Sequence, residues 1–183
     1  DEITPANAFA RGSGRLRIER AIRAGLVLNE TPANFTAANP DSGGNTSSLN
    51  LPSMARADCH GSCQFVRTFR NPGTSGALWS LSVTGLTGTL DSSLIWVPAG
   101  ASRSVTVTID TSAFPADGAF HFGQLVMVQR LSGAQTSSNV LTLPIAVAAV
   151  PPIVSVPTVV SASAVAGNSG STSFDVRNVG RAP

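Results

Sequence analysis

The chain has 183 residues, of which 12% are charged, and its formal net charge is +2 at pH 7. All 12 basic residues are arginines, and the chain contains neither lysine nor tyrosine. This low, balanced charge argues against a nucleic-acid-binding protein or a membrane-surface protein. No apolar run reaches the roughly 20 residues that cross a bilayer, so no membrane span is expected.

Residues 1–45 are predicted to form an N-terminal extension, with one short helix at 18–24 followed by a loop. Ile18 and Ile22 fall on one face of this helix, and Gly25 follows it in the position of a C-terminal glycine. A helix of under two turns is not stable alone. Its apolar face is therefore expected to need a partner.

Cys59 and Cys63 are the only two cysteines of the chain. The polar, β-rich composition is typical of secreted proteins, so we expect a disulfide between them. Closing so short a loop would contribute about 2 kcal/mol by loop entropy. A zinc site remains an alternative, with His60 beside the two cysteines and His121 as the fourth ligand, although structural zinc usually takes two separated ligand pairs.

Apolar residues alternate with polar ones over most of residues 46–148, which predicts β-strands. The predicted strands span residues 49–54, 64–70, 77–84, 86–97, 102–109, 120–130 and 140–147, and the residues at 86–97 give the weakest pattern. Turn residues separate these runs, as expected for an all-β, fibronectin III-like sandwich of about seven strands. Pro144 predicts that the last strand lies at a sheet edge.

The inward members of these runs are predicted to form the core of the sandwich, since successive side chains of a strand point to opposite faces. The predicted core residues are Phe69, Trp79, Val105, Val107, Leu125 and Val140.

Residues 149–157 are rich in proline and valine, which predicts an extended linker. Beyond it, the sequence at 175–180 (DVRNVG) resembles that at 68–73 (TFRNPG). We therefore predict that 158–183 begin a second, incomplete β-sandwich repeat, with strands at 158–164 and 171–177.

Several phrases, taken in order over about residues 8–150, resemble the C-terminal region of subtilisin-like serine proteases (subtilases). Residues 9–15 (FARGSGR), Ala21 and residues 25–28 (GLVL) resemble the end of the catalytic domain. The phrases that resemble the fibronectin type III-like domain are residues 49–53, 67–71, 98–108, 122–123 and 143–147. One departure is Ile18, where many relatives carry a proline before the helix.

The resemblance implies that this chain is a non-catalytic accessory region of a secreted serine endopeptidase. Its partner would be the protease catalytic domain, with a protein substrate as a further possibility. In that family the catalytic Asp, His and Ser all precede the segment at residues 12–14, so none of them can be placed on this chain. No cofactor is implied.

The residues at 73–77 (GTSGA) imitate the nucleophile motif of that family around Ser75. A subtilase serine begins a long helix, whereas a strand pattern follows Ser75, so we interpret it as a turn serine. His60 and His121 are the only possible histidine bases. His121 lies between two phenylalanines and is expected to be a half-exposed strand residue. The chain is therefore not expected to be an enzyme.

Two further hypotheses come from different functional classes. One is a structural subunit of an extracellular fibre, joined to other copies of the chain by strand complementation. The other is a surface- or glycan-binding module, although so few aromatic residues single out no cluster. All three hypotheses place the chain outside the cell.

Overall fold

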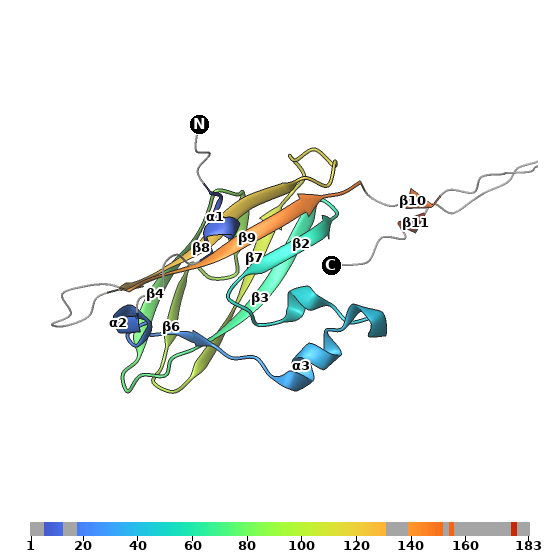
Figure 1. Cartoon of the computed structure of the whole chain (residues 1–183). Helices are drawn as coiled ribbons and strands as arrows, with labels where there is room; N and C mark the ends of the chain where they lie inside the picture. The colour runs from blue at the N-terminus through green and yellow to red at the C-terminus, as the bar shows by residue number, and fades with distance from the viewer. Residues whose placement is uncertain (1–5, 13–17, 131–138, 152–153, 156–176, 179–183) are drawn as a thin grey trace, which may run out of the picture.

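Two β-sheets pack face to face in the computed structural model of the chain, and short helices lie around them (Figure 1). The structure describes residues 6–12, 18–130, 139–151, 154–155 and 177–178. The predicted all-β sandwich is therefore observed.

The smaller sheet has four strands in the order β1-β3-β7-β5. Its strands are β1 (Val27–Leu28), β3 (Ser62–Arg70), β7 (Ser102–Asp110) and β5 (Gly88–Leu90). β3 and β7 are antiparallel and in register along their whole length. β1 was predicted to lie outside the sandwich, but it pairs with the last two residues of β3, and the adjacent Leu26 is buried in the core.

The larger sheet has five strands in the order β2-β9-β8-β4-β6. Its strands are β2 (Met54–Cys59), β9 (Val140–Ala149), β8 (Phe120–Arg130), β4 (Ala77–Thr84) and β6 (Leu94–Val97). β2 runs parallel to β9, whereas the other neighbours are antiparallel. The weakest predicted strand, 86–97, is thus two short strands, β5 and β6, in different sheets.

The predicted first strand at 49–54 is wrong, because β2 begins only at Met54. Asn50 explains the difference. Its side-chain amide donates to the carbonyl of Thr68 at 2.8 Å and accepts from the Thr68 amide at 2.8 Å. A side chain, and not a strand, therefore completes this stretch of the β3 edge.

The helices are short. They are α1 (Ala8–Arg11), α2 (Ile18–Ala21) and α3 (Pro32–Ala37), with 3-10 turns η1 (Pro40–Ser42) and η2 (Thr46–Ser48). α1 lies over β8 and β9 (Figure 1), where Phe9 contacts Phe122 with ring centroids 6.5 Å apart. The helix predicted at 18–24 is shorter and ends at Ala21, whereas Gly25, four residues further on, adopts the predicted left-handed φ of 78°.

Five of the six predicted core residues are buried, namely Phe69, Trp79, Val105, Val107 and Leu125. The prediction for Val140 was wrong, since its side chain is 57% exposed. The inward residues of β9 are the odd-numbered ones, such as Leu143 and Val147, so Val140 points to the outer face. A shift of one residue in the phase of a strand reverses every side chain.

Pro144 does not mark an edge strand, because β9 lies between β2 and β8. The Gln129 amide of β8 donates to the carbonyl of Asn139, just before β9. Following this alternation, the backbone N–H and C=O groups of the odd-numbered residues of β9 bond to β8, and those of the even-numbered residues point toward β2. The nitrogen of Pro144 therefore points toward β2, whose pairing begins one residue later, at Ile145. No ladder hydrogen bond is lost there.

Within the predicted linker, β10 (Val154–Ser155) pairs antiparallel with β11 (Arg177–Asn178). The strand predicted at 158–164, and all of the strand at 171–177 except its last residue, lie outside the described residues.

Candidate functional site

The possible catalytic residues of the sequence are not brought together. Ser75 is exposed in the turn between β3 and β4. His60 lies at the turn between β2 and β3, with Nδ1 2.9 Å from the carbonyl oxygen of Pro151. His121, on β8, stacks on Phe114 with ring centroids 4.0 Å apart. The three residues therefore lie on different elements, the two histidines contact different groups, and no nucleophile–base pair is formed among them.

A disulfide joins Cys59 to Cys63, and both residues are buried. The zinc alternative is therefore wrong, because the thiolates that would bind the metal are bonded to each other. Within the described parts of the chain, no three His, Cys, Asp or Glu residues are grouped as a metal site. The disulfide connects the end of β2 to the start of β3, and so ties the two sheets together at one corner.

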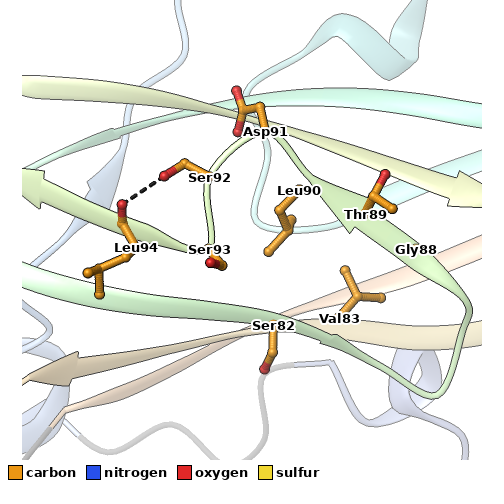
Figure 2. Close-up of a pocket in the computed structure, with 9 residues that line it drawn as sticks. All are labelled: Ser82, Val83, Gly88, Thr89, Leu90, Asp91, Ser92, Ser93 and Leu94. Atoms are coloured by element: carbon orange, nitrogen blue, oxygen red, sulfur yellow. Dashed lines mark hydrogen bonds between the residues drawn. The ribbon is translucent and has the colours of Figure 1, made fainter.

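One side of the sandwich is open between β4 and β5 (Figure 2). The chain leaves β4, crosses to β5 in the other sheet, and returns through residues 91–93 to β6. The opening that it encloses has a volume of about 620 Å³. The side chains of Val83 and Leu90 point toward it from opposite sides, and Ser82 and Ser93 are among the polar residues at its rim (Figure 2).

Backbone groups of both strands face this opening without a partner among the described residues. β5 bonds to β7 through Thr87, Thr89 and Asp91, as the bonds from Asp110 to Thr87 and from Asp91 to Thr106 indicate. The N–H and C=O groups of Gly88 and Leu90 therefore point outward.

On β4, the Leu81 amide donates to the Ser93 carbonyl at 2.8 Å. The backbone N–H and C=O groups of the odd-numbered residues of β4 therefore point toward β6. β6 pairs with β4 only as far as Ser80, which leaves the backbone of Val83 directed into the opening. Unpaired N–H and C=O groups at strand spacing are a template for an added strand. The opening can thus accept an extended peptide backbone, with an apolar side chain between Val83 and Leu90.

The outer face of the five-stranded sheet is only partly covered. α1 covers the part near Phe122, where Ala146 and Ala148 of β9 are buried. Beyond it, large apolar side chains are exposed at Leu94, Trp96 and Val140. Separately, Ile18 on α2 is 67% exposed, and Ile22, just after the end of α2, is 80% exposed.

Residues 29–53 form an excursion that is anchored on the four-stranded sheet by a buried arginine. Arg67 lies on β3 between two inward phenylalanines and is 2% exposed. Its guanidinium donates to the carbonyls of Leu51, Ser53, Ser47 and Val66 at 3.0, 2.7, 3.3 and 2.8 Å. Burial lowers the pKa of Arg67 to about 10, and the Glu30 carboxylate partly opposes this shift.

Glu30 lies near the start of the same excursion and bonds to a residue near its end. Its carboxylate accepts hydrogen bonds from the backbone amide of Asn50, the side chain of Asn34 and the backbone amide of Thr31. These bonds hold the pKa of Glu30 below its usual value of 4.5. No local sequence pattern indicates this arrangement, because the partners lie up to 20 residues apart.

Acid should loosen the excursion before it unfolds the sandwich. Because the pKa of Glu30 is lowered in the folded state, its contribution to stability is present above pH 4.5, the unfolded value, and is lost as the pH falls through the folded value. We expect hydrogen exchange at the Asn50 amide to accelerate below pH 4.5 more than exchange in β7, after correction for intrinsic rates. In Glu30→Gln this difference should vanish, and an unchanged difference would contradict the prediction.

No described helix has the length and apolar character needed to cross a membrane.

No family model matches the chain, and no curated protein matches it. Among solved structures, an ASH/PapD-like domain of human CEP192 is 7% identical with a TM-score of 0.49, and the match covers 70% of this chain and 87% of that one. SSP-19, an MSP-domain protein like family member of Caenorhabditis elegans, is 14% identical with a TM-score of 0.41 over 54% of this chain and 95% of that one.

A third similar structure is the Salmonella enterica SafA pilin in complex with the SafB chaperone, which is 8% identical with a TM-score of 0.42. The match covers 59% of this chain and 60% of that chain, which is less than two thirds of its length. None of the three is a subtilisin-like protease. At these identities and TM-scores, none of them indicates what this chain binds.

Proposed function

We propose that this chain is a non-catalytic β-sandwich that joins protein chains outside the cytoplasm, by accepting an extended segment of another copy in the opening between β4 and β5. The observation that carries the proposal is the unpaired backbone of Val83, Gly88 and Leu90 around that opening. The buried disulfide fits an oxidising compartment, such as the extracellular space or a periplasm.

In such an assembly each copy donates a strand to one neighbour and receives a strand from another. Every contact between copies is then head-to-tail. Such contacts produce open-ended series unless the rotation between copies closes a ring. Main-chain hydrogen bonds to β5 would supply affinity, and an apolar side chain placed between Val83 and Leu90 would fix the register.

The proposal predicts that blocking β5 abolishes self-association. In Leu90→Pro the lost N–H is the one that faces the opening, so pairing with β7 should persist. We expect light scattering of the wild-type chain to show multimers that grow with concentration, whereas Leu90→Pro stays monomeric. Ser93→Trp, which fills the opening from its rim, should have the same effect.

The matched control is Val66→Pro. Val66 lies on the far side of the same sheet, in a part of β3 that β1 does not reach. Its N–H also points away from β7, since the Thr68 amide two residues further on bonds to Asn50. This variant should assemble as the wild type does. A wild-type chain that is monomeric at every concentration, or a Leu90→Pro variant that assembles normally while folded, would refute the proposal.

A second candidate, the accessory region of a secreted subtilisin-like protease, is favoured by the exposure of Ile18 on α2 and of Ile22 just after it. Their surface lies within the segment that resembles the end of a subtilase catalytic domain, and would pack on that domain. If this second candidate is right, the chain should be monomeric when alone and should form a one-to-one complex with the catalytic domain. Ile22→Ser should weaken that complex and leave the self-association of the first proposal unchanged.

A further inference from the structure

A second hollow lies at the other side of the five-stranded sheet, away from the opening between β4 and β5. It is lined by residues 55–58 of the edge strand β2 and by residues 43–47 of the excursion. Phe120, the first residue of β8, forms part of its lining. Its volume is about 580 Å³, within the range of small-molecule sites.

The charged groups that line this hollow are balanced. Arg56 Nε donates to Asp58 Oδ1 at 2.9 Å, and these two are the only charged residues of the lining. The side chain of Arg56 is 10% exposed, which fixes its position. The site therefore carries no net charge, which disfavours a strongly anionic or cationic ligand.

Several polar groups remain available around the paired charges. Asn45 uses its oxygen to accept from Ser47 at 2.9 and 2.7 Å, which leaves its Nδ2 group as a donor without a partner among the described residues. Asp58 Oδ2, the terminal Arg56 nitrogens and the Thr46 hydroxyl are likewise without such a partner. The hollow thus offers both donors and acceptors, as a ligand with several hydroxyl groups requires.

Phe120 adds an apolar platform to this polar site. Its ring is 47% exposed, and it stacks on Phe122 with centroids 6.4 Å apart. Phe122 is supported in turn by Phe9 of α1 at 6.5 Å. Phe122 thus restricts the Phe120 ring and is itself supported by Phe9, so a ligand that stacks on Phe120 loses little side-chain freedom.

We propose that this hollow binds a neutral oligosaccharide. The apolar face of one pyranose ring would lie on Phe120, and the hydroxyl groups of the same or the next ring would bond to Asn45, Asp58 and Arg56. Adjacent hydroxyls suit Asp58 Oδ2 and the terminal Arg56 nitrogens, since each hydroxyl both donates and accepts. This binding would give the assembled chain an attachment site for glycans, on the side of the larger sheet opposite the proposed strand-accepting edge.

The test is a titration of the complete ¹⁵N-labelled chain with three neutral trisaccharides: cellotriose, maltotriose and triacetylchitotriose. We expect saturable amide shifts confined to Asn45, Asp58, Phe120 and their neighbours with at least one of the three. Phe120→Ser should weaken the binding at least tenfold, whereas Trp96→Ser, which removes an exposed ring elsewhere on the same sheet, should leave it unchanged. Thermal midpoints would show that both variants are folded.

The Asp58→Asn variant distinguishes a saccharide-binding site from an anion-binding site. The variant leaves Arg56 unpaired, so saccharide affinity should fall, whereas affinity for an acidic peptide would rise if the site bound anions. The proposal is wrong if none of the three trisaccharides causes shifts up to about 10 mM, a concentration well above a millimolar dissociation constant. It is equally wrong if Phe120→Ser binds as the wild type does, or if only the acidic peptide binds.

Discussion

Replacing Arg67 by methionine is expected to lower the free energy of unfolding by about 3–5 kcal/mol. Methionine fills much of the same volume, but it cannot donate to the carbonyls of Leu51, Ser53 and Ser47. Those acceptors are held against the sandwich by the guanidinium, and a buried carbonyl without a donor costs about 1–3 kcal/mol. The loss should be measured by urea unfolding at neutral pH.

The matched control is Arg70→Met, three residues further along β3. Arg70 is exposed, so its replacement should change the free energy of unfolding by about 0.5 kcal/mol or less. Hydrogen exchange adds a second measurement for Arg67→Met, because amides in residues 29–53 should lose protection before those of β7. A loss below about 1 kcal/mol, or equal loss of protection in both regions, would contradict the role given to Arg67.

Strands with one face toward the core and the other toward solvent could be predicted closely from the sequence. The predicted strands at 77–84 and 120–130 coincide with β4 and β8, because every second residue of β4 is apolar and turn residues precede both strands. The alternation at 64–70 likewise placed Arg67 on the same face as two phenylalanines. What it could not show was that this inward arginine has carbonyl partners on a distant segment.

Errors arose where side chains replace strand pairing or where pairing is very short. Asn50 imitates a strand partner for Thr68, so the alternation at 49–54 was mistaken for a strand. β1 pairs over only two residues, too few to produce a periodic signal. Both features depend on contacts between distant parts of the chain, which a local pattern does not encode.

The candidate site could not be predicted from side-chain motifs. The opening between β4 and β5 is defined by backbone N–H and C=O groups, which every residue carries. The available sequence signal was the poor alternation at 86–97, which reflects the passage of the chain from one sheet to the other and back. The saccharide-site residues come from three separate segments that only the fold brings together.

Truncating Trp79 to alanine is expected to cost about 3–5 kcal/mol of unfolding free energy. The indole is fully buried on β4, and a Cβ placed on Gly25 would lie only 2.9 Å from it, so the chain entering the sandwich after α2 packs directly on this ring. Its removal leaves a cavity that the paired strands β6 and β8 cannot collapse to fill. Thermal and urea unfolding would both report the loss.

Trp96 provides the control, since it is the only other tryptophan and is 57% exposed. Trp96→Ala should cost far less than Trp79→Ala, although Trp96 lies against Gly76. Trp79→Phe should also be milder, because phenylalanine fills most of the cavity and removes an indole N–H that is buried without a described partner. Equal losses for Trp79→Ala and Trp96→Ala would mean that the inward phase of β4 is wrong, because only an inward ring can leave a cavity in the core.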